Sequence, residues 1–318
     1  MSRDDVLVIG GGGFVGRALV SQLVARGRRI HVLGRREVTG LSPQVSVHGG
    51  GLENEDALRR LLPDCATVFH LACTTTPSVS AALPMLEMVE NIAPTLRFLS
   101  VLQDFPDTHL IFMSSGGTLY GNVGFRSAVE DDPINPQSFH GAGKAALEAF
   151  LRAHAVRSGS PLTILRPSNL YGPGQSLREG FGVVRAMLER ARSGMPLEIW
   201  GDGEAVRDFI YIDDMVEICA RFSELKNDRG TYNAGSGKGY SLNQLRSVVE
   251  TATGRSLRVN YGPRRAVDVQ HVELDTTRLR ERLRWTPQVS LEHGVGATWE
   301  WLVAGGALSA RGDRAAVP

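Results

Sequence analysis

The sequence predicts an α/β protein built on a doubly wound parallel sheet, with a smaller C-terminal lobe. Short apolar, β-branched segments alternate with segments of helical periodicity along most of the chain. The first strand leads directly into a glycine-rich turn and then a helix, as in dinucleotide-binding folds. A length of 318 residues, 42% of them hydrophobic, allows a large core shared by two lobes.

The composition argues against several classes of function. The chain has 35 basic and 34 acidic residues, so its net charge of +1 points neither to nucleic acid nor to an anionic membrane surface. Its three cysteines are widely spaced without a CxxC pair, which argues against a disulfide framework or a metal site. No apolar run approaches the roughly eighteen residues that span a bilayer. We therefore expect a soluble, cytoplasmic protein.

The N-terminal segment carries a dinucleotide-binding pattern. A strand at 6–9 enters a G-G-G-G-F-V-G turn, and a helical pattern follows. Glycines let the backbone approach a pyrophosphate, and the positive end of the helix favours its negative charge. The residues that we expect to bind the cofactor here are Gly10, Gly13, Phe14, Val15 and Gly16.

The second strand, at 30–33, ends without an acidic residue. An acid at this place holds the ribose hydroxyls of NAD, whereas arginine accommodates the 2′-phosphate of NADP. Here Gly34 is followed by Arg35 and Arg36. The sequence therefore favours NADP(H), with NAD as the alternative, because exposed arginines are often only solvated.

The next elements bring polar side chains to the carboxyl edge of the sheet. A buried strand is predicted at 67–72, ending in Leu71 and Ala72, and Cys73 and Thr75 follow it. Cys73 resembles a small buried residue more than a nucleophile, because no activating base is evident. A helix is then predicted from about residue 82 to 102, and after it a strand from 110 runs into an S-S-G-G-T loop.

The segment P-Q-S-F-H-G-A-G-K-A-A-L-E at 136–148 predicts a helix with a proton-transfer pair. His140 and Lys144 are four residues apart and therefore lie on the same face, one turn from each other. An imidazole gives or takes protons near neutral pH. The ammonium beside it would tune the ring and hold a cofactor ribose.

Together, these segments resemble the extended short-chain dehydrogenases/reductases of the nucleotide-sugar epimerase/dehydratase branch. The resemblance runs in unbroken order from residue 5 to about 302 and includes R-P-S-N-L-Y-G-P-G at 166–174 and the G-D-G-E-A-V-R-D block from 201. The segment at 136–148 is similar to the branch's P-x-S-x-Y-G-x-x-K-x-x-x-E helix, with His140 in place of the tyrosine.

The resemblance also implies a domain organisation. An NAD(P)-binding Rossmann domain would span residues 1–172 and about 206–234. A nucleotide-sugar-binding lobe would comprise residues 173–205 and 235–302. Residues 303–318, rich in Ala, Gly and Arg, would form a tail without fixed structure.

The family pattern implies roles for individual residues. His140 would move the proton, and Lys144 would hold the nicotinamide ribose. Many members carry a catalytic Ser or Thr where Gly116 stands, so we expect Thr118, with Ser115 second, to hydrogen-bond the sugar oxygen. Both hydroxyls could equally satisfy loop backbone. The further cofactor-binding residues would be Leu71, Ala72, Lys144 and Pro167, and the substrate-binding residues Cys73, Thr75, Asn169, Arg207, Arg264 and Asp268.

The implied activity is oxidoreduction at carbon 4 of a nucleotide-diphosphate hexose, with a slight preference for a 4-ketoreductase. The alternative is a UDP-glucose-like 4-epimerase with tightly bound NAD. A catalytically silent binding protein is a further alternative, because the chain departs from the family at Gly34, Gly51 and His140. A dehydratase is disfavoured because the T-D-E triplet of such relatives is absent. The resemblance also implies a homodimer.

Overall fold

A seven-stranded parallel sheet forms the centre of the protein. The computed structural model describes residues 4–35, 38–178, 180–225, 227–264 and 269–306. Within them, the strand order is β10-β6-β5-β4-β1-β2-β3, and every neighbouring pair is parallel. The chain order reverses between β1 and β4, so the prediction of a doubly wound sheet is confirmed. The strands are β1 (Asp5–Ile9), β2 (Ile30–Gly34), β3 (Val45–Gly49), β4 (Cys65–His70), β5 (His109–Met113), β6 (Leu162–Pro167) and β10 (Thr231–Ala234).

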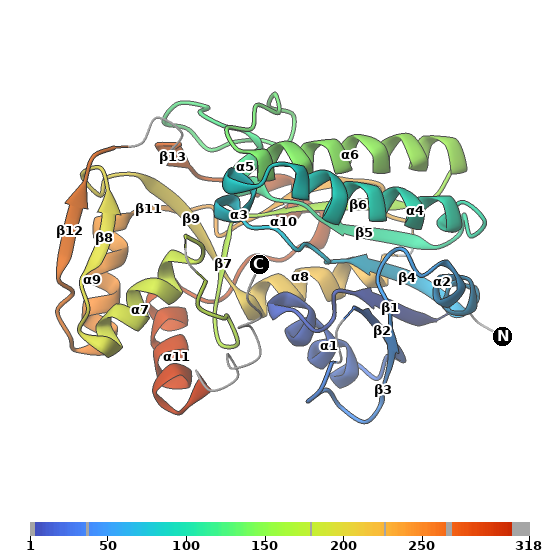
Figure 1. Ribbon diagram of the computed structural model, residues 1–318, viewed down its shortest axis with the longest axis horizontal. Coiled ribbons are helices and arrows are strands. Elements are labelled where there is room, and N and C mark those ends of the chain that lie inside the picture. Colours follow the sequence, from blue (N-terminus) through green and yellow to red (C-terminus); the bar gives the residue numbers. More distant parts are fainter. Residues whose placement is uncertain (1–3, 36–37, 179, 226, 265–268, 307–318) are drawn as a thin grey trace.

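Helices cover both faces of this sheet (Figure 1). Strand β1 is buried throughout, and its alternate residues point to opposite faces. Val6 and Val8 join a core cluster with α1 and α8, whereas Leu7 and Ile9 join a second cluster with α2, α4 and α6. The helices on the sheet are α1 (Phe14–Ala25), α2 (Glu55–Leu61), α4 (Ala93–Leu102), α6 (Phe139–Ser158) and α8 (Ile212–Glu224).

The segment between β4 and α4 differs from the single helix predicted from about 82 to 102. The structure has α3 (Pro77–Ala82), an interruption at Leu83, and a π-helical turn, η2 (Glu87–Ile92), that continues into α4. Pro94 has no N–H to donate back into the preceding turn, which accounts for the wider turn there. This π-helical turn carries Glu87 and Asn91 toward α6.

The C-terminal part builds two smaller sheets beside the carboxyl end of the central one (Figure 1). In the first, β9 pairs with β7, β11 and β13, and in the second β8 pairs with β12. These strands are β7 (Asn169–Tyr171), β8 (Leu197–Trp200), β9 (Val206–Tyr211), β11 (Gly239–Ser241), β12 (Val259–Gly262) and β13 (His271–Val272). The remaining helices are η1 (Leu62–Asp64), α5 (Gly116–Leu119), α7 (Val183–Ser193), α9 (Leu242–Thr253), α10 (Thr277–Leu283) and α11 (Leu291–Val303).

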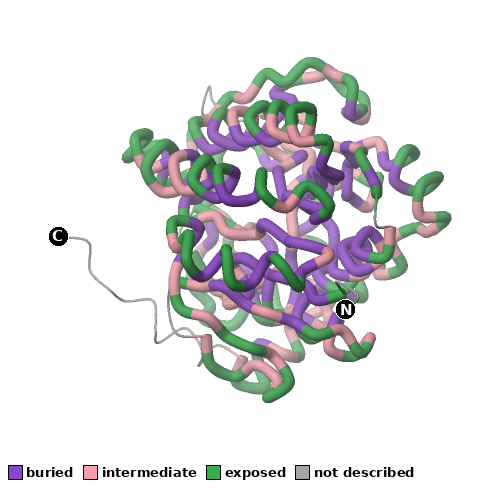
Figure 2. Tube along the Cα trace, turned by 90° about the vertical axis from the view of Figure 1, so that its right-hand side faces the viewer, coloured by how far each residue is buried: buried purple, intermediate pink, exposed green. Residues whose placement is uncertain are grey.

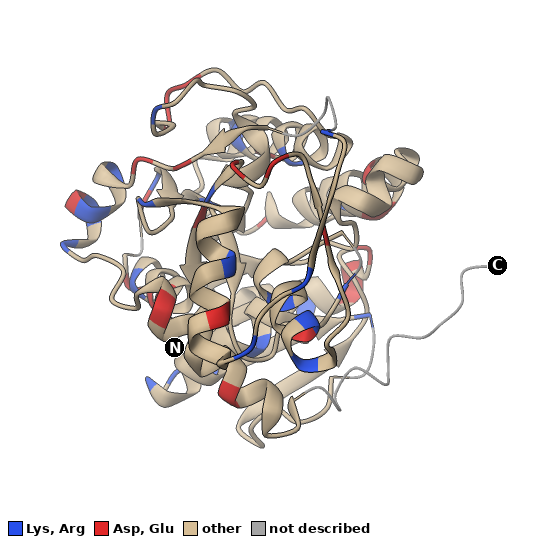
Figure 3. Cartoon of the chain, turned by 90° about the vertical axis from the view of Figure 1, so that its left-hand side faces the viewer, with Lys and Arg blue, Asp and Glu red and all other residues tan. Residues whose placement is uncertain are grey.

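Burial and charge follow this architecture. Figure 2 shows the buried segments concentrated in the central sheet and on the inward faces of the helices. Charged residues of both signs are interspersed along the chain (Figure 3). Among the described helices, none combines the length and the apolar character needed to cross a membrane. The described residues also contain no group of His, Cys, Asp and Glu arranged to hold a metal. Of the predicted tail, 303–318, Val303 is the last residue of α11, and the residues from 307 onward lie outside the described residues.

Candidate active site

The glycine turn after β1 lies against the end of β4, at the point where the strand order reverses. Gly10 has a φ of +89°, and a Cβ atom there would lie 2.8 Å from the backbone nitrogen of Ala72. The backbone N–H of Leu71 donates to the carbonyl of Ile9. Because a side chain at Gly10 would collide with the backbone directly after β4, this tight approach requires glycine.

The N-terminus of α1 has the character of a phosphate-binding site. Gly13 is its N-cap, and within the described residues no side chain caps it and no acidic side chain lies in its first turn. Phe14 and Val15 are half-buried at the entrance, and Gly16 is buried. The positive end of the helix dipole is therefore not neutralised locally, which fits the pyrophosphate of a dinucleotide.

Arg35, directly after β2, is already engaged by an acid. Its Nη1 lies 2.6 Å from Oε2 of Glu90, which is part of η2. Both side chains are partly exposed, so this pair is accessible to solvent and can exchange partners. Arg36, the second predicted phosphate-binding arginine, lies outside the described residues.

His140 is buried near the start of α6 and faces η2. Its Nδ1 lies 3.3 Å from Oε1 of Glu87 and 3.3 Å from Oγ1 of Thr75. The helix begins at Ser138, whose side chain accepts from the backbone N–H of Gly141 and so fixes the first turn that carries His140. His140 therefore meets both a carboxylate and a hydroxyl that other elements supply.

Glu87 is held in this position by donors from three elements. Oε1 accepts from Ser80 Oγ on α3, and Oε2 accepts from Asn91 Nδ2 at 2.9 Å. Burial alone would raise the pKa of Glu87, but hydrogen bonds from His140, Ser80, Thr75 and Asn91 outweigh it and lower the pKa to about 2. The carboxylate is thus ionised at neutral pH.

Lys144 reaches the end of β5. Its Nζ donates to the carbonyl of Met113 at 2.9 Å and lies 5.1 Å from the ring centre of Phe112. Burial, and then the nearby Lys144 ammonium, lower the pKa of His70 to about 3. The predicted tuning of His140 by Lys144 stays a prediction, whereas the carboxylate of Glu87 lies in direct contact with the ring.

Thr118 lies in α5, a four-residue helix where a loop was expected, and Ser115 is the N-cap residue of that helix. Thr118 Oγ1 donates to Ser115 Oγ at 2.9 Å, and both residues are partly exposed. Gly116 is packed closely, because a Cβ atom there would lie 2.5 Å from Leu274 Cδ1 and 2.9 Å from the carbonyl oxygen of Arg166. A Ser or Thr side chain therefore does not fit at this position without a shift of its neighbours.

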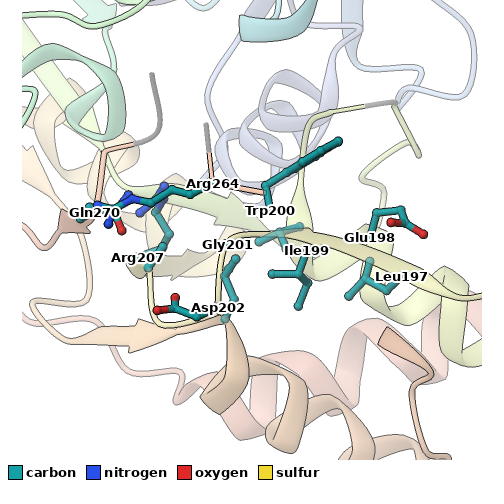
Figure 4. A pocket seen from close by; sticks show the side chains of 12 residues that line it. Leu197, Glu198, Ile199, Trp200, Gly201, Asp202, Arg207, Arg264 and Gln270 are labelled. Atoms are coloured by element: carbon teal, nitrogen blue, oxygen red, sulfur yellow. The ribbon is translucent and has the colours of Figure 1, made fainter. Parts of the chain in front are cut away.

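A cavity of about 180 Å³ lies in the C-terminal part, away from His140. In Figure 4, Arg207 from β9, Arg264 and Gln270 gather at one end of it, and Trp200 extends toward the other. Two cationic side chains at one end and an aromatic ring at the other suit a ligand that carries phosphate and a planar group.

Four other predicted ligand-binding residues remain to be placed. Asn169 begins β7, and its Nδ2 donates to the carbonyl of Asp208, so its side chain presently ties β7 to β9. Pro167 ends β6, and the buried Oγ of the following Ser168 has no partner among the described residues. Cys73 is half-buried beside Thr75. Asp268 lies outside the described residues.

The sequence analysis missed Glu87 and Ser80. A signal for Glu87 was present, because it stands four residues before Asn91 and so shares its helix face. The role of Glu87, however, depends on its contact with His140 in α6, which is more than fifty residues away in the chain. Ser80 carried no recognisable signal, since a serine in a short polar segment is commonly a turn or cap residue.

Comparison with known proteins gives one consistent family. The model of the NAD dependent epimerase/dehydratase family matches residues 6–235. A UDP-glucose 4-epimerase of Mycolicibacterium smegmatis is 30% identical and aligns over 93% of this chain and 97% of its own length. A dTDP-4-dehydro-6-deoxyglucose reductase of Escherichia coli is 28% identical over 92% and 96% of the two chains.

Solved structures agree with this family. The UDP-glucose 4-epimerase of Thermotoga maritima, determined with UDP-glucose, superposes with a TM-score of 0.87 at 33% identity and covers 94% of this chain and 99% of that one. The Thermus thermophilus UDP-glucose 4-epimerase, determined with NAD, has a TM-score of 0.86 at 30% identity, with 95% and 99% covered.

Proposed function

The chain belongs to the NAD-dependent epimerase/dehydratase family, and we propose that it acts at carbon 4 of a nucleotide-diphosphate hexose, with net reduction of a 4-keto sugar preferred to 4-epimerisation. This family consists of extended short-chain dehydrogenases/reductases that act on nucleotide sugars. Both 4-epimerases and 4-ketoreductases occur among the relatives. The proposal rests chiefly on the buried pair His140 and Lys144, which stand in the family's proton-transfer positions.

The cofactor that we propose is NADP(H). The absence of an acidic residue directly after β2, together with Arg35, supports it. The turn at Gly10 and the uncapped start of α1 would hold the pyrophosphate, and Leu71, Ala72 and Pro167 would line the nicotinamide side. The bound nicotinamide would supply or accept the hydride.

The chain's own residues would move the proton and hold the sugar. His140 would donate a proton to the oxygen on carbon 4 during reduction and remove it during oxidation. Lys144, fixed on the carbonyl of Met113, would hold the nicotinamide ribose. Thr118, whose hydroxyl donates to Ser115 in the free protein, would turn it to donate a hydrogen bond to the same sugar oxygen.

We further propose that the nucleotide end of the substrate occupies the cavity beside Arg207 and Arg264. Their guanidinium groups suit a diphosphate, and Asn169 would turn from Asp208 to meet it. Cys73 and Thr75 would border the sugar. Of these residues, Arg264 comes from the predicted substrate-binding lobe, whereas Asn169 and Arg207 come from segments that the sequence analysis assigned to the Rossmann domain.

A 4-epimerase that retains NAD is the second candidate. The observation that favours it is the ion pair between Arg35 and Glu90, because it occupies the guanidinium that a 2′-phosphate would need. An epimerase uses one bound dinucleotide for both half-reactions, whereas a ketoreductase consumes NADPH.

A homodimer also fits the proposed function. Apolar side chains are exposed on η2, α4 and α6, which are neighbours on one face of the sheet. Burying such a patch against a second copy would remove apolar area from water. The exposed side chains are Met88, Val89, Leu96, Phe150 and Val156.

One experiment separates the candidates. The purified protein is denatured and the released dinucleotide is identified by mass spectrometry. The protein is then titrated with NADH and NADPH and assayed with UDP-glucose and with a dTDP-4-keto-6-deoxyhexose. An empty protein that prefers NADPH and reduces the keto sugar supports the ketoreductase. Retained NAD with interconversion of the 4-epimers supports the epimerase, and binding of neither dinucleotide overturns both.

A further inference from the structure

We propose that Glu87 is a positioning residue for His140 and that the two side chains together replace the tyrosine of the family. Glu87 would fix the imidazole with its proton on Nδ1, so that Nε2 exchanges the catalytic proton with the substrate. This inference rests on the proposed function, because it assumes that His140 is the proton-transfer group.

The contacts around Nδ1 favour one tautomer. The carboxylate oxygen Oε1 of Glu87 and the hydroxyl oxygen of Thr75 both lie 3.3 Å from Nδ1. The hydroxyl oxygen also accepts from Asn91 Nδ2 at 2.9 Å, and the Thr75 hydroxyl is itself a donor to Glu87. Nδ1 is therefore surrounded by acceptors, and a bare lone pair there would face a negative charge.

The carboxylate is held firmly enough to orient the ring. Glu87 is 6% exposed and His140 is 8% exposed, so water has little access to the contact between them. Asn91 and Ser80 also donate hydrogen bonds to the carboxylate and hold it in place. A charged hydrogen bond with both partners fixed is the arrangement that sets a histidine tautomer in proton-transfer sites.

The fold makes specific room for this contact. Gly143 lies one turn after His140, and a Cβ atom there would be 2.6 Å from Oε2 of Glu87. An alanine would therefore push the carboxylate away from α6. Glu87 lies in the π-helical turn of η2, so an irregular turn in one helix meets a glycine in the other at this contact.

The proton cycle of the pair balances. When carbon 4 is oxidised, its C–H bond breaks and the hydride would pass to the nicotinamide cofactor; the hydroxyl O–H bond breaks and its proton forms an N–H bond at Nε2, which leaves an imidazolium beside the Glu87 carboxylate. When carbon 4 is reduced, a hydride would return to it from the cofactor, the Nε2 proton returns to the oxygen and the neutral Nδ1–H form is restored. Glu87 stays ionised throughout. The other nearby cation, Lys144, bonds to the carbonyl of Met113.

Nitrogen NMR of the full-length protein tests the tautomer without reference to activity. The chain contains eight histidines, and the ring signals of His140 are those that disappear in His140→Gln. In neutral wild-type protein we expect the proton on Nδ1. A proton on Nε2 with a bare Nδ1 would overturn the proposal, and this result does not depend on the Glu87 variants folding.

Steady-state kinetics of Glu87→Gln test whether proton transfer by His140 depends on the carboxylate. The loss of the carboxylate is expected to reduce kcat about 100-fold or more while KM changes less than about twofold, because proton transfer and not binding is impaired. Gly143→Ala should lower kcat in the same direction, and the conservative Glu87→Asp should restore part of it. The exposed pair Asp104–Arg59 provides the control Asp104→Asn, with unchanged kcat.

The two hypotheses fail differently. An unchanged tautomer and an unchanged kcat in Glu87→Gln would overturn the role of Glu87 alone. Full activity in His140→Ala would overturn the proton-transfer role of the histidine, even where NMR shows the proton on Nδ1.

Discussion

Glu87 and His140 face each other between η2 and α6, with Oε1 of the carboxylate 3.3 Å from Nδ1 of the ring. The histidine stands where the family has a tyrosine, whose phenol carries no second hydrogen-bonding atom. An imidazole needs a partner on one nitrogen to present the other in a defined protonation state. Glu87 supplies that partner, so the substitution at residue 140 is accompanied by a matching environment.

The first prediction concerns His140 itself. His140→Ala should abolish measurable turnover, because general acid-base catalysis contributes about 100-fold to 10,000-fold. The dissociation constant of the dinucleotide should remain nearly unchanged, since the start of α1 and Lys144 are untouched. Steady-state kinetics and a fluorescence titration of the cofactor measure the two quantities. Activity that survives the substitution would remove the histidine from the mechanism.

The second prediction concerns the pH dependence of stability. The pKa of Glu87 is lowered from 4.5 to about 2 in the folded protein. A carboxyl with a depressed folded pKa contributes stability that is complete above the unfolded pKa and is lost as the pH falls through the folded pKa. At about 1.4 kcal/mol for each pKa unit, this contribution is about 3 kcal/mol.

Urea unfolding of wild type and Glu87→Gln at several pH values measures this contribution. The difference in the free energy of unfolding should be largest above about pH 5 and should shrink steadily toward pH 2. A difference that does not depend on pH would show that the glutamine acts through packing and not through charge.

Local patterns predicted the fold, because strand and helix periodicities and glycine turns are properties of neighbouring residues. The turn at Gly10 and the helix carrying His140 are found where the sequence indicated. The predicted helix from about 82 to 102 was wrong in its first part, since Leu83 interrupts it and the π-helical turn follows. Both irregularities lie near prolines, yet the sequence alone does not say whether a helix breaks at a proline or widens into a π-helical turn.

The candidate site was only partly predictable for a related reason. Family motifs pointed to His140 and Lys144 as site residues, which stays a prediction, but the contact of His140 with Glu87 depends on two helices meeting at a glycine. Likewise, the pairing of Arg35 with Glu90 joins residues that are far apart in sequence. Such contacts appear only when the tertiary arrangement is known.

The third prediction concerns the choice of cofactor. If Arg35 binds the 2′-phosphate, then Glu90 competes with that phosphate for the guanidinium. Glu90→Gln should therefore tighten NADPH binding several-fold, and Arg35→Ala should weaken it about tenfold, since a charged hydrogen bond contributes about 1.5–3 kcal/mol. NADH binding should change little in either variant, which makes it the internal control. Equal effects on both dinucleotides in a titration would contradict the NADP(H) assignment.

The fourth prediction concerns the position where relatives carry a catalytic hydroxyl. Gly116→Ser would restore that hydroxyl, but its Cβ atom would lie 2.9 Å from the backbone carbonyl of Arg166. A backbone carbonyl cannot move aside as easily as a flexible side chain. We therefore expect a loss of about 1–3 kcal/mol in the free energy of unfolding and no gain in kcat. Gly117→Ser is the matched control, because no described atom outside its chain neighbours and its own helix backbone lies within 4 Å of a Cβ atom there. Denaturant unfolding of the two variants should separate them, and a Gly116→Ser protein as stable as Gly117→Ser, with higher turnover, would mean that the hydroxyl is tolerated and used.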